Sequence, residues 1–139
     1  MMFEKPARRI KTLLIVEDEP LVAFDNEHLL QTLGYVVVAT VDNAAEALLA
    51  IEAGGIDLVL SDVRLRDSNG RDVALAAKRA GVPLLFVTAS SPADAPGIAL
   101  GCLSKPYSQN DLKRASEAVD VHLSGNKPKR MPKGLTIYG

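Results

Sequence analysis

Five polar residues in this sequence each lie at the end of a short apolar segment. They are Glu17, Asp18, Asp62, Thr88 and Lys105. A carboxylate at the end of a buried strand is costly unless a cation or a chemical role uses its charge. If the apolar segments are parallel strands, these residues meet at the carboxyl edge of the sheet, where ligands and chemistry gather. The sequence therefore predicts that they form one polar site.

The three carboxylates in this set predict a magnesium site. Three negative charges brought together repel one another unless a hard cation lies among them. Mg²⁺ binds oxygen ligands, needs only one or two carboxylates and keeps positions for water and a phosphate oxygen. Thr88 and the backbone N–H of Ala89 could donate hydrogen bonds to that phosphate, and Lys105 would supply positive charge. A phosphoryl group held here could be transferred to Asp62, giving an acyl phosphate.

Strand-like and helix-like segments alternate along the chain and would position this site. The expected strands are 12–16, 35–40, 57–61, 84–88 and 100–104. The expected helices are 20–33, 44–53, 70–80 and 108–123. Apolar strands separated by helices are typical of a parallel sheet that is covered on both faces. We therefore expect an α/β fold with a doubly wound, five-stranded parallel sheet.

The segment between Thr88 and Lys105 is short for a loop, a helix and a return to the fifth strand. Pro92, Pro96 and Gly97 fall within it. If Pro92 began a helix, Pro96 would lack the N–H that the next helical hydrogen bond needs. We predict that the fourth helix is absent or at most one turn.

Composition indicates one cytoplasmic domain. The chain has 139 residues and 47% hydrophobic content, which suits a single core. Lys and Arg total 16 against 17 for Asp and Glu, so net charge gives no argument for nucleic acid or a membrane surface. Cys102 is the only cysteine, which excludes an intrachain disulfide and a multi-cysteine zinc site. The apolar run 13–16 is too short to span a bilayer and does not fit a secretory leader.

Charge and glycine content divide the chain into three parts. We expect a basic N-terminal arm over residues 1–10, a folded domain over 11–123 and a basic, disordered tail over 124–139. The tail places Lys and Arg residues among prolines and glycines, a composition that does not build a core. It is also too short to form a DNA-binding output domain.

Four sequence motifs surround the candidate site residues. They are Leu14-Ile15-Val16-Glu17-Asp18-Glu19, Asp57-Leu58-Val59-Leu60-Ser61-Asp62-Val63-Arg64-Leu65 with Gly70, Phe86-Val87-Thr88-Ala89, and Lys105-Pro106-Tyr107. Together they resemble the response-regulator receiver domain of two-component signalling, over roughly residues 11–123. Each motif alone is weak, and the combination is specific. The resemblance implies the flavodoxin-like receiver fold.

The resemblance also implies a role for each acidic position. Asp62 is then the phosphoacceptor and a metal ligand. Asp18 and the backbone carbonyl of Arg64 bind magnesium directly, and Glu17 acts through a water. The phosphoryl donor is a histidine kinase or a histidine phosphotransfer protein.

The resemblance also implies which residues bind the phosphoryl group. Thr88, the backbone N–H of Ala89 and Lys105 bind the phosphoryl group, and Thr88 and Lys105 couple its arrival to movement. Receivers commonly have a cis bond at the Lys-Pro step, so Pro106 is a cis-peptide candidate.

Two features depart from the usual receiver pattern. Most receivers have Phe or Tyr three residues before the lysine, and its ring moves on phosphorylation; here that switch position is Cys102. We expect the aromatic switch to be missing or rebuilt. The shortened fourth helix is similar to that of the single-domain receivers of alphaproteobacterial general stress signalling, whose Phe-Ala-Thr-Gly-Tyr motif corresponds to Phe86-Val87-Thr88-Ala89-Ser90 here.

Three functions compete. The leading hypothesis is a single-domain response regulator that is phosphorylated on Asp62, catalyses only its own phosphorylation and dephosphorylation, and signals by protein contact. The alternative is a pseudoreceiver, which docks partners without using phosphate. The third is a phosphohydrolase with an aspartyl nucleophile of the haloacid-dehalogenase type, which would need a second Asp where this chain has Arg64.

Overall fold

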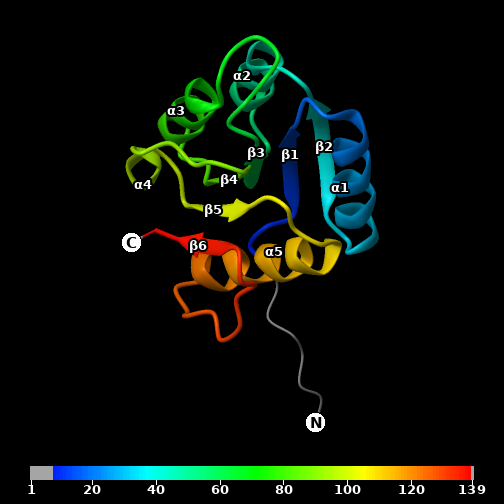
Figure 1. Cartoon of the computed structure of the whole chain (residues 1–139), viewed down its shortest axis with the longest axis vertical. Coiled ribbons are helices and arrows are strands. Elements are labelled where there is room, and N and C mark those ends of the chain that lie inside the picture. Colours follow the sequence, from blue (N-terminus) through cyan, green and yellow to red (C-terminus); the bar gives the residue numbers. More distant parts are fainter. Residues whose placement is uncertain (1–7, 139) are drawn as a thin grey trace.

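Six strands form one sheet in the computed structural model, which describes residues 8–138 (Figure 1). They are β1 (Thr12–Val16), β2 (Val36–Val41), β3 (Leu58–Ser61), β4 (Leu84–Thr88), β5 (Gly101–Ser104) and β6 (Leu135–Ile137). The order across the sheet is β2-β1-β3-β4-β5-β6. The first five strands run parallel, as the sequence predicted, and β6 is antiparallel to β5.

Helices cover both faces of the sheet. They are α1 (Pro20–Thr32), α2 (Ala44–Ala53), α3 (Arg71–Arg79), α4 (Ala95–Ile98) and α5 (Gln109–Leu123). Helices α1 and α5 lie on one face, and α2, α3 and α4 lie on the other (Figure 1). Within residues 8–138, no helix combines the length and the apolarity that crossing a bilayer requires.

Each face of the sheet has its own hydrophobic core, because successive side chains of a strand point to opposite sides. In β1, Leu13 and Ile15 pack in the cluster with α1 and α5. Leu14 and Val16 pack in the cluster with α2 and α3. A strand buried on both faces has no polar side, which explains the unbroken apolar run in the sequence.

Local side-chain contacts fix where helices begin. The Asn43 side chain accepts the backbone N–H of Glu46 at the start of α2. Ser108 and Asp111 form a reciprocal capping box at the start of α5. The Asp67 carboxylate accepts backbone N–H groups from the first turn of α2, which ties the loop after β3 to that helix. These are the caps expected of Asn, Ser and Asp.

The fourth helix is a single turn, which confirms the prediction from its prolines. Helix α4 spans only Ala95–Ile98. Two side chains of α3 hold this turn in place: the Arg71 guanidinium donates to the Asp94 carboxylate, and Lys78 Nζ donates to the carbonyl of Gly97 at 2.6 Å. The turn therefore keeps a fixed position although it lacks the length of an ordinary helix.

The expected disordered tail contains the sixth strand, so that prediction was wrong for residues 135–137. These residues pair with β5, and Leu135 is buried in the core beside α5. Gly101 lies so close to the carbonyl of Thr136 that a Cβ at position 101 would collide with it. The strand was missed because its apolar run is very short and its partner is distant in sequence. The sheet consequently has six strands rather than five.

The expected N-terminal arm is only partly described, because residues 1–7 lie outside the described residues. Residues 8–10 pack on the folded domain. The backbone N–H groups of Arg9 and Ile10 donate to Asp120 Oδ1 at 2.9 and 2.8 Å, and Ile10 is buried. The Arg8 guanidinium lies over the ring of Tyr35, 4.3 Å from its centroid. The folded domain therefore begins before residue 11.

Candidate functional site

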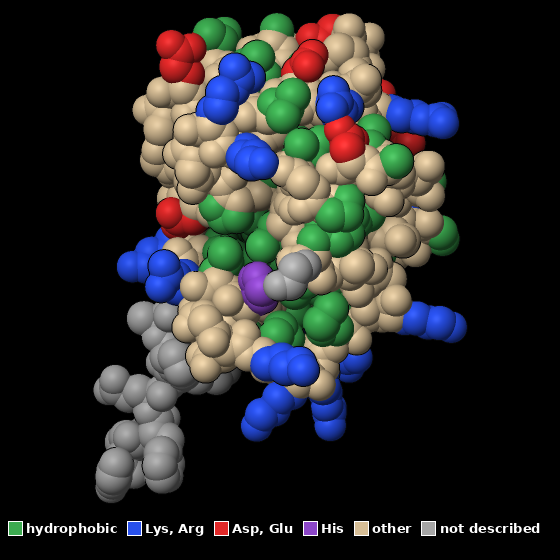
Figure 2. Space-filling view, turned by 90° about the vertical axis from the view of Figure 1, so that its left-hand side faces the viewer, with side chains coloured by type: hydrophobic (Ala, Val, Ile, Leu, Met, Phe, Trp, Pro, Cys, Tyr) green, Lys and Arg blue, Asp and Glu red, His purple; other side chains and the backbone are tan. Residues whose placement is uncertain are grey.

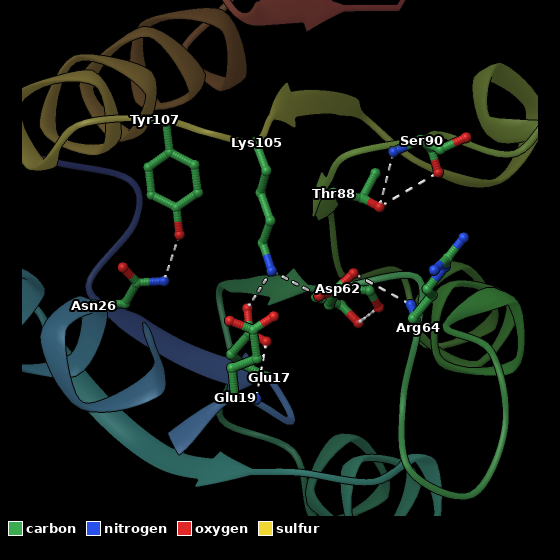
Figure 3. Close-up of polar contacts among 10 residues, drawn as sticks. Glu17, Glu19, Asn26, Asp62, Arg64, Thr88, Ser90, Lys105 and Tyr107 are labelled. Carbon is green, nitrogen blue, oxygen red and sulfur yellow. Dashed lines mark hydrogen bonds and ion pairs between the residues drawn. The ribbon is translucent and has the colours of Figure 1, made fainter. Parts of the chain in front are cut away.

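The carboxyl ends of four parallel strands bring the predicted polar residues together (Figure 3). Strand β1 leads into Glu17 and Asp18, β3 into Asp62, and β5 into Lys105, and Thr88 is the last residue of β4. Strands β1 and β3 are neighbours, but their following helices cover opposite faces of the sheet. This divergence opens the edge of the sheet at the point where ligands bind in doubly wound folds.

Lys105 forms ion pairs with two buried carboxylates. Its Nζ lies 2.8 Å from Asp62 Oδ2 and 2.9 Å from Glu17 Oε1. The exposed fraction of the side chain is 19% for Lys105, 3% for Glu17 and 9% for Asp62. Burial alone would lower the pKa of Lys105, but its hydrogen bonds to Asp62 and Glu17 outweigh burial and raise that pKa. The ammonium group is therefore held in its charged form.

The acidic cluster carries more negative charge than Lys105 can balance. Carboxylate oxygens of Glu17, Asp18 and Asp62 all lie within 4.8 Å of one another. Burial raises the pKa of Glu17, although its hydrogen bonds with Lys105 and with the backbone N–H of Glu19 act against that rise. Three carboxylates and one ammonium group leave a deficit of positive charge in a site largely screened from water.

This donor set fits a magnesium ion. Hard oxygen ligands are what Mg²⁺ prefers, and one or two carboxylates suffice for it. The backbone N–H of Arg64 donates to Asp62 Oδ1 at 3.2 Å, which places the Arg64 backbone directly beside the cluster. Glu17, Asp18 and Asp62 are the carboxylates that would hold the ion, and the Arg64 carbonyl as a ligand stays a prediction from the resemblance.

Gly70 allows the loop after β3 to fold back on Asp62. The N–H of Gly70 donates to the carbonyl of Val63, and a Cβ at position 70 would collide with the carbonyl of Asp62. Arg64 and Asn69 form an isolated antiparallel bridge across the same loop. The position of Arg64 beside the acidic cluster therefore depends on the missing side chain at Gly70.

Thr88 and its following loop form the opposite wall of the site. The Thr88 hydroxyl donates to the carbonyl of Ser90 and accepts the Ser90 N–H, both at 3.3 Å (Figure 3). The Lys105 N–H donates to the Thr88 carbonyl at 2.9 Å, which fixes the two strand ends together. A hollow of about 410 Å³ lies between the walls and is lined by Asp18, Glu19, Pro20, Asp62, Arg64, Thr88, Ala89, Ser90 and Lys105.

A second polar contact anchors the loop that carries Lys105. Asn26 Nδ2 donates to the hydroxyl of Tyr107 at 2.8 Å, and burial raises the pKa of Tyr107. The Lys105-Pro106 bond is cis, as the sequence predicted. Asn26 was not singled out from the sequence, because it has no motif spacing and contacts Tyr107 only through the fold.

Cys102, the altered switch position, is buried in β5 on the side of α4. Burial raises the pKa of its thiol, so the neutral form is favoured. Tyr138 packs against the same cluster from beyond β6. An aromatic ring is therefore present near this position, supplied from a different part of the chain.

The sequence over residues 13–117 matches the family model described as the response regulator receiver domain. The chain belongs to this family. Receiver domains act in two-component signalling and interact with histidine kinases or phosphotransfer proteins. The fold agrees, because the parallel strands follow the order β2-β1-β3-β4-β5 of flavodoxin-like sheets.

Individual relatives show how far this similarity extends. The receiver is 41% identical over 80 residues to the phyllosphere-induced regulator PhyR of Methylorubrum extorquens, covering 55% of this chain and 30% of PhyR. It is 34% identical to SdrG of Sphingomonas melonis Fr1, with a TM-score of 0.66, covering 77% of this chain and 93% of SdrG. The chain spans between 30% and 58% of the length of the curated relatives it matches.

One structural neighbour bears on the acidic cluster. The receiver domain of sensor histidine kinase PA1611 from Pseudomonas aeruginosa PAO1 is 25% identical, with a TM-score of 0.67, covering 77% of this chain and 94% of that domain. Its structure has a magnesium ion coordinated in the active-site cleft. In the present receiver the acidic cluster consists of Glu17, Asp18 and Asp62.

Proposed function

We propose that this receiver accepts a phosphoryl group on Asp62 in a magnesium-dependent reaction and signals through protein contacts. The observation that carries the proposal is the environment of Asp62. Its buried carboxylate lies beside those of Glu17 and Asp18 and is 2.8 Å from the Lys105 ammonium. Such an arrangement binds positive charge and a phosphoryl group together, and positioning and charge are most of what phosphoryl transfer needs.

In the proposed reaction, an Asp62 carboxylate oxygen forms a bond to phosphorus. The bond from phosphorus to the leaving group breaks, and the leaving group keeps the electron pair. With a phosphohistidine of a histidine kinase or phosphotransfer protein, the leaving group is imidazole; with acetyl phosphate it is acetate. A bound Mg²⁺ supplies neutralisation of the charge on the phosphoryl oxygens.

Three residues of this chain bind the phosphoryl group in the proposed reaction. Lys105 neutralises charge on the phosphoryl group, because its ammonium already contacts the acceptor carboxylate. Thr88 and Ala89 line the hollow, and in this proposal the Thr88 hydroxyl and the Ala89 N–H supply hydrogen bonds to phosphoryl oxygens. Thr88 must give up its bond to the Ser90 carbonyl to do so, because a hydroxyl has one proton to donate.

Radiolabelled acetyl phosphate tests this function. The protein is incubated with the donor in Mg²⁺ or in EDTA, and label is counted on the protein and as free phosphate. We expect up to one equivalent of label on the protein, dependent on Mg²⁺. If neither acetyl phosphate nor a phosphorylated histidine phosphotransfer protein labels it, the docking-module interpretation gains support. Many turnovers of a phosphomonoester would instead indicate a phosphohydrolase.

A further inference from the structure

The chain turns sharply where α5 ends. Gly125 has a positive φ of 84°, its N–H donates to the His122 carbonyl at 3.0 Å, and the Asn126 N–H donates to the Val121 carbonyl at 3.2 Å. These two hydrogen bonds form a Schellman motif, which fixes the direction in which the chain leaves the helix. At its other end the segment enters β6, which pairs with β5. The loop over residues 126–134 is therefore held at both ends.

A groove of about 730 Å³ lies between this loop and α5. It is lined by Arg114, Glu117, Ala118, Val121, Asn126, Lys127, Pro128, Lys129 and Arg130. Ala118 is buried, Pro128 is half-buried, and Val121 is 36% exposed. The charged side chains of the set are all exposed. The groove therefore combines a few apolar side chains with a charged rim.

The rim of the groove is predominantly basic. Its cations are Arg114, Lys127, Lys129 and Arg130, and Glu117 is its single carboxylate. Among residues 8–138, no carboxylate oxygen lies within 4.0 Å of any of these four cations. Lys and Arg side chains gather at the lower end of the molecule in Figure 2, at the level of α5 and the following loop in Figure 1. The positive charge is thus available to a ligand.

The groove has the opposite charge to the rest of the chain. Residues 124–139 have four basic residues and no acidic residue. Of the 16 basic and 17 acidic residues of the chain, twelve basic and all 17 acidic residues therefore lie in residues 1–123. A local excess of one sign attracts a ligand of the other sign and speeds its association. The ligand that fits this groove is an anion.

The lining distinguishes between two kinds of anionic partner. None of the described residues that line the groove is aromatic, whereas proteins that bind single-stranded nucleic acid stack bases on aromatic side chains. Four cations also provide fewer phosphate contacts than the roughly six to ten of a strong duplex binder. Ala118, Val121 and Pro128 suit an aliphatic side chain instead.

We propose that the groove between α5 and the loop over residues 126–134 binds an acidic peptide segment of a partner protein. An apolar side chain of that segment packs against Val121 and Pro128, and its carboxylates pair with the cations of the rim. This interaction surface is separate from the phosphorylation site, and the proposal does not depend on phosphorylation of Asp62.

Fluorescence anisotropy tests the proposal with the full chain at physiological ionic strength. The probe is a short fluorescein-labelled peptide in which two Leu residues lie among Glu residues. One matched peptide has Gln in place of Glu, and another has Ser in place of Leu. The Glu-Leu peptide should bind, and the Gln peptide should bind at least about tenfold more weakly because several exposed ion pairs are lost. The Ser peptide should bind at least about threefold more weakly because the apolar contact is lost.

Charge reversal locates the binding site. Lys129→Glu should weaken binding of the Glu-Leu peptide at least about fivefold, because an attraction becomes a repulsion. Arg79→Glu is the matched control, since it makes the same change in net charge at an exposed site on α3, which lies on the other face of the sheet. It should bind as the wild type does, and thermal unfolding checks that both variants fold. No binding of the Glu-Leu peptide, or equal weakening by both variants, would overturn the proposal.

A change in backbone conformation separates a formed groove from a loose basic tail. Gly125→Val keeps every charge but places a β-branched residue at a positive φ, which strains the turn after α5. It should bind the Glu-Leu peptide at least about threefold more weakly. Gly55→Val makes the same change at another positive φ with open space around its Cβ, and it should bind as the wild type does. Undiminished binding by Gly125→Val would contradict the groove.

Two other occupants would give different results. A mixed-sequence single-stranded oligonucleotide that binds more tightly than the Glu-Leu peptide, and is weakened by Lys129→Glu, would assign the groove to nucleic acid. Self-association of the protein alone, measured by sedimentation velocity and removed by Lys129→Glu, would assign it to a second copy of the chain. Either result would overturn the acidic peptide as the occupant.

Discussion

The Lys105 ammonium lies 2.8 Å from Asp62 Oδ2, so the residue proposed to accept phosphate is already ion-paired. The same ammonium is 2.9 Å from Glu17, and both carboxylates are almost fully buried. Lys105 therefore holds together an acidic site that would otherwise repel itself. Lys105 is therefore expected both to stabilise the folded protein and to take part in phosphorylation, and separate experiments can measure the two effects.

Replacing Lys105 with Met should destabilise the metal-free protein. The substitution keeps the aliphatic volume but leaves Asp62 and Glu17 buried without their cation. Removing one partner of a buried pair costs about 3–5 kcal/mol, and the partial exposure of Lys105 reduces this to about 2–3 kcal/mol. Urea unfolding in EDTA measures the change. Lys113→Met, an exposed site on α5, should stay within about 0.5 kcal/mol of the wild type. Equal stability of Lys105→Met and wild type would contradict this assignment.

Replacing Asp18 with Asn should have opposite effects with and without metal. Without Mg²⁺ it removes one of three crowded charges, which should stabilise the protein by on the order of 1 kcal/mol. With Mg²⁺ it removes a ligand, so the rise in stability with Mg²⁺ concentration seen for the wild type should disappear. Thermal unfolding across a Mg²⁺ titration measures both effects. Glu52→Gln, on the exposed side of α2, should retain the wild-type response. An unchanged Mg²⁺ response in Asp18→Asn would exclude it as a ligand.

Asp57 should contribute stability that depends on pH. Its carboxylate accepts the backbone N–H groups of Lys11 and Thr12 at 2.8 and 3.1 Å. Burial alone would raise its pKa, but these hydrogen bonds together lower it below the ordinary 3.8. The Asp57 carboxylate therefore stabilises the folded protein above pH 3.8. This stabilisation is lost as the pH falls through the pKa of Asp57 in the folded protein, which is lower than 3.8. Asp57→Ala should cost about 1–2 kcal/mol at neutral pH and much less in strong acid. Urea unfolding at both pH values tests this, and an equal cost at both would contradict it.

Gly70→Ala should disturb the site from outside it. The new Cβ would meet the Asp62 carbonyl, so the loop carrying Arg64 must move. Overpacking of this kind costs about 1–3 kcal/mol. Urea unfolding measures the cost, and the rate of labelling by acetyl phosphate should fall in parallel because Asp62 is displaced. Gly97→Ala is the matched control, since its Cβ meets nothing. A Gly70→Ala protein with wild-type stability and labelling would show that the close approach is not required.

The parallel sheet and the five polar site residues were predictable from the sequence because each is a local signal. Apolar runs mark buried strands, and the sheet topology alone brings their ends together. The one-turn α4 was predictable for the same reason, since Pro96 can lie only in the first turn of a helix and β5 already begins at Gly101.

The remaining features depend on contacts between distant segments. Strand β6 needs the open edge of β5 and the missing Cβ of Gly101, which is more than thirty residues earlier in the chain. The Asn26 to Tyr107 hydrogen bond likewise joins helix α1 to the loop after β5. Neither of these two contacts can be recognised from the spacing of its residues in the sequence. Tyr138 was overlooked because a short basic tail gave no reason to place an aromatic ring against Cys102.

Intact mass spectrometry after incubation with acetyl phosphate and Mg²⁺ tests the central claim most directly. The wild type should gain the mass of one phosphoryl group, and Asp62→Asn should gain none. Asp57→Asn is the matched control, because Asp57 precedes the same strand at its opposite end, and it should gain the group as the wild type does. A phosphoryl group that persists in Asp62→Asn, or its absence from the wild type with every donor, would contradict the account.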